Sequence, residues 1–436
     1  MKRLIVLIIL ACLTLSVWGQ PPSIEIITPV SGYYVAPATI DANSLPDRLI
    51  FIDTREGQLD SYVTDKKTID DPIWSSFTNS IVAFTYDEAL NSQGFGLISY
   101  DPFTAELEYL LQNTELMFPV SWTEDGKVYY IGFENGYALR ALNLDNFNVN
   151  TMLEYLPEGE FVLPSHLSPS PSSFHSGRIV SADVNPEDSN WLIIQVIGLY
   201  QSVDGEDSST TIAFLYHAET GNIIGLNSII NDSPFRSPSR WNSDGRQLFF
   251  RFRDNSLAIV NFDLVTNDVN LETVVSADDL YAIDWLDISD ILLMRRGDTY
   301  YLGQALNGVL RTQEFFTITS SLDHFVIDMG DWKFTGTPDE AAQLSCIFDE
   351  TLPTRLEIGA QAQVASTDGT PSRLRSEPST WGDVVQSLPE GTIFEIIGGY
   401  MCGSGYRWWQ VQLADGTQGW IAESSETEYW IERRAS

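Results

Sequence analysis

Basic side chains are scarce in this 436-residue sequence. Lys and Arg number 24 against 60 Asp and Glu, which gives a formal net charge of −36. A field of this sign repels the phosphates of nucleic acids and of anionic lipid headgroups. The charge therefore argues against nucleic acid as a partner. The 43% hydrophobic and 12% aromatic content excludes a disordered chain and indicates a large folded core.

Motifs of common catalytic sites are also lacking. No Gly-x-Ser-x-Gly elbow is present, and Gly403-Ser404-Gly405 lies in a β-rich region without a following helix. The four His residues (166, 175, 217 and 324) are scattered and form no His-Glu-x-x-His motif. Ordinary turn chemistry explains two oxygen-rich loops, 183–190 and 204–208, which lack the calcium-loop register. We expect no catalytic residues, metal or other cofactor, with Ca²⁺ at these loops as the alternative.

Long apolar runs are confined to the N-terminus, and no later stretch approaches the roughly 18 residues of a membrane-spanning helix. Residues 1–19 begin with Met1-Lys2-Arg3, continue with an apolar stretch and end in Val17-x-Gly19. This pattern is typical of a secretory signal peptide cleaved before Gln20. We expect a secreted or cell-envelope protein whose mature chain has no transmembrane helix. The alternative is a lipoprotein anchored through Cys12, because residues 9–12 resemble a lipoprotein processing site.

Cysteine occurs three times in the sequence. If Cys12 is removed with the signal peptide, Cys346 and Cys402 remain. In an exported chain such a pair is either a disulfide or two separately buried thiols. The cysteine count alone is compatible with both interpretations.

The apolar periodicity of helices is absent between residues 46 and 334, where turn residues separate short apolar runs. Trp122 is followed by Asp125-Gly126, and Trp241 by Asp244-Gly245, each time before a hydrophobic strand. Asp-Gly between apolar runs indicates a β-hairpin. Weaker copies of the pattern occur around Trp74, Asn185 and Trp285. These anchors lie 44 to 63 residues apart, which suits the four-stranded blades of a β-propeller, at roughly 40–50 residues per blade.

The repeats resemble the blade motif of TolB-like propellers, in which a Trp-x-x-Asp-Gly element joins the first two strands. The resemblance implies an all-β fold with a six-bladed TolB-like β-propeller at 46–334. The polar, proline-containing sequence before it predicts an N-terminal lead-in at 20–45 with one β segment around 24–27. The first blade is short of strands, so we expect residues 323–328 and Trp332 to complete it. This closure would remove exposed sheet edges. A large β-sandwich with two similar hairpins is the alternative.

The character of the sequence changes after a linker at 335–355. The motifs Leu374-Arg-Ser-x-Pro378, Leu388-Pro-x-Gly391, Trp409-x-Val411 and Gly419-Trp-Ile421 occur in the order of a bacterial SH3 domain, which this segment resembles. The resemblance implies a small SH3-like β-barrel at 356–424, followed by a C-terminal tail at 425–436. It also implies a disulfide between Cys346 and Cys402, because exported relatives pair cysteines at these places.

Strand alternation assigns Trp409 and Trp420 to the barrel core. Strand phase, or a position in the expected loop at 371–379, predicts that Tyr406, Trp408 and Arg375 are exposed. Small barrels bind peptides or glycans through such aromatic surfaces, and the resemblance to wall-targeting barrels suggests the same here. We expect non-catalytic binding. The propeller would be a platform for a protein or glycan, and the barrel a tether to cell-wall peptidoglycan or an extracellular peptide or protein. The alternative is an enzyme that acts on glycans in the propeller channel, because the fold hosts both roles.

Overall fold

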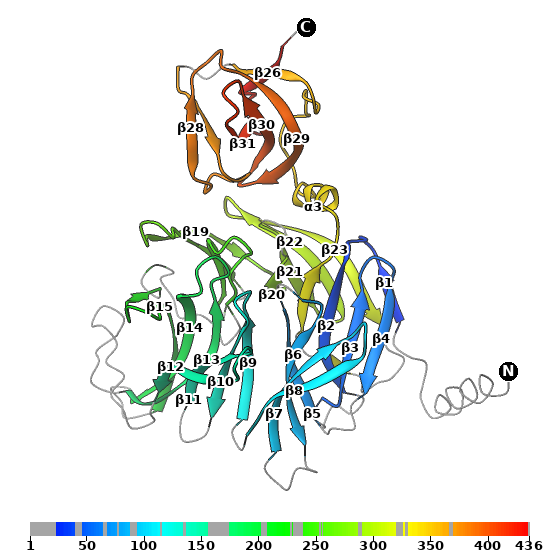
Figure 1. Ribbon diagram of the computed structural model, residues 1–436, viewed down its shortest axis with the longest axis vertical. Coiled ribbons are helices and arrows are strands. Elements are labelled where there is room, and N and C mark those ends of the chain that lie inside the picture. The colour runs from blue at the N-terminus through cyan, green and yellow to red at the C-terminus, as the bar shows by residue number, and fades with distance from the viewer. Residues whose placement is uncertain are drawn as a thin grey trace, which may run out of the picture.

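The protein consists of a β-propeller and a small β-barrel that sits on one end of it (Figure 1). The computed structural model describes residues 23–434 except 40–45, 64–67, 76–77, 88–93, 114–115, 134–136, 156–173, 202–206, 227–228, 230–238, 253, 255, 287–289, 320–325, 328–329 and 366–368. The expected signal peptide and Cys12 lie outside the described residues. Within them, no helix has the length and apolar character needed to cross a membrane.

Four of the six blades are formed by consecutive strands of antiparallel sheets. Blade two comprises β5 (Thr68–Trp74), β6 (Ile81–Asp87), β7 (Gly94–Asp101) and β8 (Glu106–Asn113). Blade three comprises β9 (Leu116–Trp122), β10 (Lys127–Phe133), β11 (Tyr137–Asn143) and β12 (Val149–Tyr155). Blade four comprises β13 (Phe174–Val184), β14 (Trp191–Gln201), β15 (Asp207–His217) and β16 (Ile223–Gly225). Blade five comprises β17 (Gln247–Arg251), β18 (Ser256–Phe262) and β19 (Val269–Ser276), with Trp241 bridged to Leu248 in place of a first strand.

Blades one and six take strands from both ends of the propeller sequence. Blade one contains β2 (Gly32–Thr39), β3 (Arg48–Asp53) and β4 (Gln58–Val63), and β2 also pairs with β24 (Val326–Ile327) and β25 (Asp331–Phe334). Blade six contains β20 (Tyr281–Trp285), β21 (Leu292–Arg296), β22 (Thr299–Leu306) and β23 (Val309–Thr319), and β1 (Ser23–Ile26) pairs with β23. The predicted six-bladed, all-β ring is therefore confirmed, and so is its closure through Val326–Ile327 and Trp332.

The β segment expected around residues 24–27 is confirmed as β1, but the prediction that residues 23–39 precede the propeller is wrong, because they form strands of blades six and one. The segment Gly32–Thr39 is buried along nearly its whole length because it is a central strand. Burial on both faces removes the polar alternation that identifies a strand in sequence. Pro37 further obscured the signal, since proline is unusual inside a central strand.

The four tryptophan anchors occupy equivalent places, as the repeat predicts. Trp74, Trp122 and Trp285 end the first strands of their blades, and Trp241 is bridged where that strand would run in blade five. Each indole is buried in the apolar cluster between its own blade and the preceding one. In blade four the amide of Asn185 donates to the carbonyl of Trp191. Asn185 is therefore the residue that follows the anchor position. Val184 occupies that position, one residue before the expected anchor.

Aspartates join neighbouring blades at the level of these tryptophans. Asp331 accepts hydrogen bonds from the amide of Trp332 (2.9 Å) and from the amide of Trp74 in the next blade (2.6 Å). Asp183 repeats the arrangement with the amides of Val184 (3.0 Å) and Trp241 (2.9 Å). Such charge-assisted bonds to backbone N–H groups are stronger than neutral ones, so each carboxylate holds two blades in register.

A short helix and a seven-stranded sheet follow the propeller. The helix α3 (Pro338–Ser345) begins with a capping box formed by Thr337 and Glu340. The sheet order is β28-β27-β31-β30-β29-β26-β32. Its strands are β26 (Gln361–Val364), β27 (Ser372–Arg375), β28 (Val384–Leu388), β29 (Ile393–Gly403), β30 (Tyr406–Leu413), β31 (Gln418–Ser424) and β32 (Ile431–Arg433). The predicted tail at 425–436 therefore supplies a barrel strand, and the predicted linker at 335–355 contains a helix.

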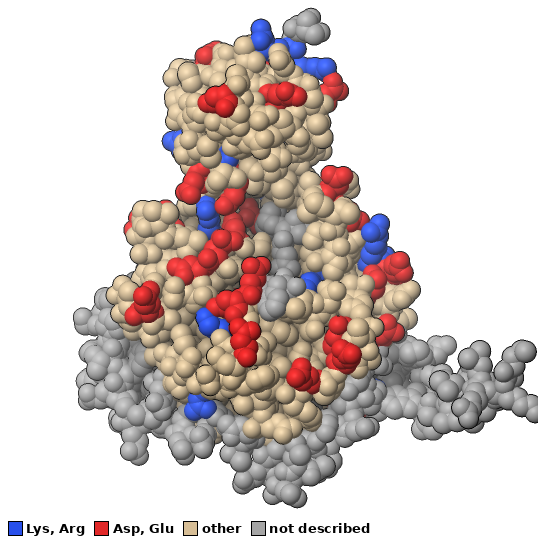
Figure 2. All heavy atoms as spheres, in the orientation of Figure 1, with Lys and Arg blue, Asp and Glu red and all other residues tan. Residues whose placement is uncertain are grey.

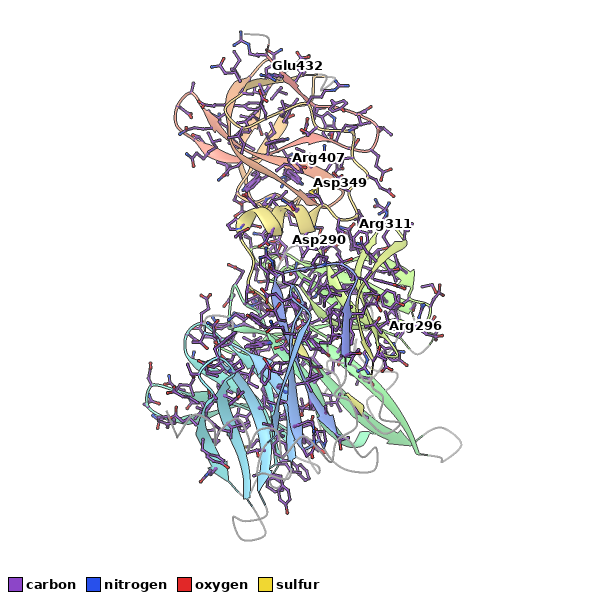
Figure 3. The ribbon with its side chains drawn as sticks, turned by 90° about the vertical axis from the view of Figure 1, so that its right-hand side faces the viewer. Asp290, Arg296, Arg311, Asp349, Arg407 and Glu432 are labelled. Atoms are coloured by element: carbon purple, nitrogen blue, oxygen red, sulfur yellow. A yellow bond between two sulfur atoms is a disulfide. The ribbon has the colours of Figure 1, made fainter. Side chains whose placement is uncertain are left out.

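The helix and the segment after it are fixed to the barrel by three kinds of contact. Cys346, at the end of α3, forms a disulfide with Cys402 of β29, with Cα atoms 4.9 Å apart, as predicted. Arg407 forms a buried ion pair with Asp349; both are labelled in Figure 3. The buried carboxylate of Glu423 accepts hydrogen bonds from Trp409 Nε1 (2.8 Å) and the amide of Arg355 (2.8 Å). The barrel thus includes its connecting segment.

Replacement of an anchor tryptophan should destabilise the propeller selectively. Trp122, only 7% exposed, fills the space between blades two and three, so Trp122→Ala should lower the free energy of unfolding by about 3–5 kcal/mol. The control Val265→Ala removes a side chain that is 80% exposed and should change it by less than about 0.5 kcal/mol. Urea unfolding measures both, and equal effects would contradict the blade packing.

The disulfide should stabilise the barrel. The 56-residue separation of Cys346 and Cys402 corresponds to about 4 kcal/mol of lost unfolded-state entropy. Cys402→Ser should therefore lower the barrel's urea midpoint and leave the propeller transition nearly unchanged. Peptide mapping without reductant should recover the two cysteines as one linked peptide, and recovery as two free thiols would refute the bond.

Candidate functional site in the barrel

A groove of about 420 Å³ runs along one side of the barrel. Strand β27 contributes Arg373 and Arg375, whose side chains alternate with that of Leu374. Leu374 points into the apolar core, so the two arginines lie on the outer face. The groove therefore follows from the pleat of this strand.

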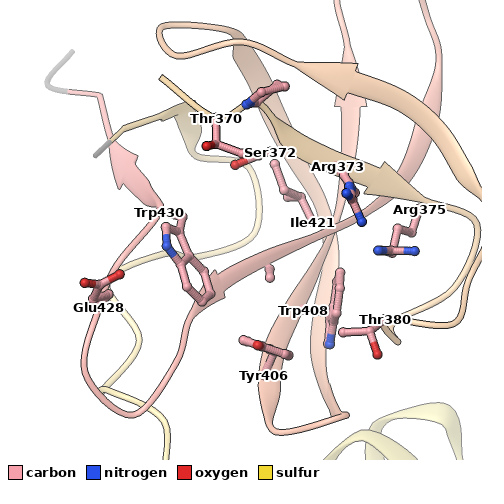
Figure 4. A pocket seen from close by; sticks show the side chains of 12 residues that line it. Thr370, Ser372, Arg373, Arg375, Thr380, Tyr406, Trp408, Ile421, Glu428 and Trp430 are labelled. Atoms are coloured by element: carbon pink, nitrogen blue, oxygen red, sulfur yellow. The ribbon is translucent and has the colours of Figure 1, made fainter. Parts of the chain in front are cut away.

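Three aromatic rings form the floor and one side of the groove. Tyr406 and Trp408 belong to β30, and Trp430 lies just before β32. The ring centroid of Tyr406 is 6.0 Å from that of Trp408 and 5.5 Å from that of Trp430. Figure 4 shows the rings on the floor and left of the groove, with Arg373 and Arg375 on the right. Rings in this arrangement can contact the apolar faces of a ligand.

The three residues named from the sequence, Arg375, Tyr406 and Trp408, all line this groove, but two are less accessible than expected. Trp408 is 3% exposed and Arg375 is 9% exposed. The prediction of exposure was wrong for these two residues, because strand phase and loop position do not show what covers a side chain; Arg375 in fact ends strand β27. Trp408 Nε1 donates to the Gly403 carbonyl (2.9 Å), and Arg375 Nη1 donates to the Gly382 carbonyl (2.6 Å). Trp408 and Arg375 thus face outward from the barrel core, but neighbouring parts of the groove cover them.

The two core assignments have different outcomes. Trp409 lies in the barrel core, as predicted. Trp420 is only half-buried and is absent from that core. Strand β31 carries Ile421 inward, so its neighbour Trp420 must face outward.

The charges of the two groove arginines, Arg373 and Arg375, are not paired with any described carboxylate. Burial, reinforced by the charge of Arg373, lowers the pKa of Arg375. A partly buried cation beside a like charge is electrostatically unfavourable. The groove is therefore suited to an anionic group.

A second set of charged residues joins the barrel to the propeller. Asp290 accepts a hydrogen bond from the Ser404 amide (3.1 Å), and Arg246 contacts the Trp381 carbonyl and Glu377 (3.4 Å). Asp290 lies directly beneath the barrel in Figure 3. Acidic side chains also gather below the barrel on the face shown in Figure 2. This junction is mostly acidic, and one guanidinium bridges its two sides.

The propeller channel contains a further cavity of about 420 Å³, lined by Asp71, Arg240 and apolar residues of blades three and four. Arg240 Nη1 donates to the Val120 carbonyl (2.8 Å) and lies 3.6 Å from Asp183 Oδ1. Burial raises the pKa of Asp183 to about 6, although Arg240 opposes the shift. Asp183 and Asp331 both accept bonds from backbone amides that join blades, so their positions have a structural explanation.

In the oxygen-rich loop at 183–190, side-chain oxygens accept hydrogen bonds from backbone amides of the same loop. Asn185 Oδ1 accepts from the amides of Glu187 (2.9 Å) and Asp188 (3.1 Å), which is an ordinary turn pattern. Among the described residues, the one grouping with metal-like spacing includes Cys346 and Cys402. Their sulfurs are bonded to each other. The start of the second loop, 204–208, lies outside the described residues.

The geometry defines a six-bladed β-propeller joined to an SH3-like barrel. Residues 369–427 match the bacterial SH3 domain family, which confirms the domain expected from the sequence motifs. This match covers a small part of the chain and identifies the domain alone. No curated protein sequence matches the chain.

Several solved structures are similar to the chain. TolB from Acinetobacter baumannii is 13% identical, with 70% of this chain and 68% of TolB covered and a TM-score of 0.42. The periplasmic gluconolactonase of Pseudomonas aeruginosa is 13% identical, with 66% and 99% covered and a TM-score of 0.38. An oligogalacturonate lyase from Vibrio parahaemolyticus is 14% identical, with 65% and 74% covered and a TM-score of 0.36. Likenesses this distant assign no activity to the chain.

Sequence reasoning missed Trp430, Arg373 and Glu428 as groove residues. Trp430 and Glu428 fall in the segment interpreted as a tail, and tertiary pairing of β32 brings them to the groove. Arg373 had a usable signal, because it lies two residues before Arg375 on the same strand face.

The barrel junction should tighten as the pH falls through about 6. Burial, then the neighbouring Asp290, raise the pKa of Asp244 from 3.8 to about 6. Burial also raises the pKa values of Asp290 and Glu377, and Arg246 opposes the shift at Glu377. The barrel contacts this group through Ser404 and Glu377. Separation of the barrel would expose the carboxylates and return their pKa values toward the ordinary range, so the docked state should bind protons more readily than an open state. Docking should therefore gain on the order of 1–3 kcal/mol between pH 7.5 and pH 5.

Hydrogen exchange at the Ser404 amide, corrected for its intrinsic pH dependence, measures this docking. Protection should be greater at pH 5, and Asp244→Asn should remove much of the difference. Asp268→Asn, at an exposed carboxylate of the same blade, is the control. Greater protection of the Ser404 amide at pH 7.5 than at pH 5 would contradict the predicted direction of the pH dependence.

Proposed function

We propose that this chain is a non-catalytic binding protein of the bacterial cell envelope or exterior, and that its barrel groove binds cell-wall peptidoglycan. One observation carries the proposal: the groove combines three aromatic rings with two arginines that lack carboxylate partners among the described residues. In a chain with 60 acidic and 24 basic side chains, such unpaired cations at a concave aromatic surface are suited to an external ligand.

Export is part of the same proposal. The Cys346–Cys402 disulfide is of a type that persists in oxidising compartments. The N-terminal signal pattern supports the same location, with lipidation at Cys12 as the alternative. The barrel would hold the chain at the wall, and the propeller would present its remaining surface to a protein or glycan partner.

The rival function is glycan turnover in the propeller channel. Its support is the cavity at Asp71 and Arg240. Two of the nearby carboxylates, Asp183 and Asp331, already accept bonds from amides that join the blades. The barrel groove is therefore the stronger candidate. Release of reducing ends from wall glycans by the full chain, abolished by Arg240→Gln, would favour the enzyme instead.

Trp430→Ala tests the proposed site. Trp430 is half-buried beside Tyr406 and is absent from the apolar core, so its removal should leave the barrel folded. Loss of this stacking surface should weaken retention of the full chain on purified cell wall by about 1–3 kcal/mol. Trp408 is a poorer choice, because its buried, hydrogen-bonded indole also supports the fold.

Ile358→Ala serves as the matched control, since Ile358 is 63% exposed and outside the groove. Sedimentation with wall preparations should show retention equal to that of the unaltered chain. Equal retention of Trp430→Ala would place wall binding elsewhere and contradict the proposal.

A further inference from the structure

The charges around the groove indicate which chemical class of ligand it takes, provided that the groove is the binding site proposed above. Arg373 and Arg375 are two residues apart on β27 and lie on the same face of the strand. Their like charges face one groove. An anionic group between them would relieve the repulsion and accept hydrogen bonds from both guanidinium groups.

Other arginines near the barrel show that carboxylate partners are readily found in this chain. Arg246, Arg311, Arg407 and Arg433 form ion pairs with Glu377, Glu350, Asp349 and Glu357, respectively. The groove pair differs from all four. Arg375 uses one N–H group for the Gly382 carbonyl (2.6 Å), and a guanidinium has five. Donors therefore remain for a ligand.

An acidic residue lies across the groove from the arginines. Glu428 belongs to the turn between β31 and β32, where its amide donates to Ser425 Oγ (3.2 Å). Its exposed carboxylate has no partner among the described residues. Figure 4 shows Glu428 on the left of the groove, Arg373 and Arg375 on the right, and the aromatic rings between them. The groove therefore has a positive side, an apolar floor and a negative side.

We propose that the groove recognises a short peptide that carries a carboxylate at one position and an ammonium group at another. The carboxylate binds Arg373 and Arg375, the ammonium group lies near Glu428, and the intervening atoms contact Tyr406 and Trp430. A neutral glycan could stack on the rings but would leave the buried guanidinium of Arg375 without its counter-charge. Wall peptides rather than wall sugars are thus the part of peptidoglycan that is bound.

The test uses the full chain and a synthetic tetrapeptide, acetyl-Ala-Gln-Lys-Ala, with a free C-terminal carboxylate. Isothermal titration compares it with its C-terminal amide and with its side-chain-acetylated form. Amidation should weaken binding roughly tenfold or more, because a charge-assisted pair is lost. The same comparison on Arg373→Gln should give a much smaller difference. Acetylation of the lysine should weaken binding to the unaltered chain and have little effect on Glu428→Gln.

Arg434→Gln is the control variant, because it removes an exposed barrel arginine that does not line the groove. It should retain the full effect of amidation. Equal affinity for acid and amide, or binding of chitohexaose without binding of the peptide, would overturn the dipolar assignment. If Trp430→Ala still reduced wall retention in that case, the proposed function would stand with a different ligand class. Unchanged wall retention would refute the proposed function itself.

Discussion

The constraint on which this structure depends is that a ring of sheets must leave no open edge. Strands β24 and β25 pair with β2, and β1 pairs with β23, so both ends of the propeller sequence are consumed in its closure. An unpaired strand would expose a row of amide and carbonyl groups. The helix α3 follows directly from this joint. Its Glu340 forms an ion pair with Arg55 (3.0 Å), and Leu344 packs into the apolar cluster of blades six and one.

The position of the barrel follows from the same joint. Because α3 is packed on the closing blades and bonded to the barrel through Cys346–Cys402, the barrel cannot move far from that end of the propeller. Asp290 and Arg246 add polar contacts from the propeller side. The helix, the disulfide and these polar contacts thus connect the barrel to the blades that close the ring.

The parts of the fold that could be predicted are those with local signals. The turns at Asp125-Gly126 and Asp244-Gly245 could be predicted from residue type alone, because both glycines adopt the positive φ that such turns require. Gly245 also has no room for a side chain, because a Cβ would lie 2.3 Å from Asn185 Oδ1. Strand β2 and the groove residue Trp430 could not be found this way. Strand β2 pairs with β25, and β32, which follows Trp430, pairs with β26. Both partner strands are far away in the sequence.

The central claim is that the barrel groove, and not the propeller, contacts the cell wall. Tryptophan indole signals in a heteronuclear NMR spectrum of the full chain separate the two, because the groove contains Trp408 and Trp430 while the anchors such as Trp285 are buried between blades. Added soluble wall fragments should shift the Trp430 and Trp408 signals and leave that of Trp285 in place. Shifts confined to the propeller tryptophans would contradict the account.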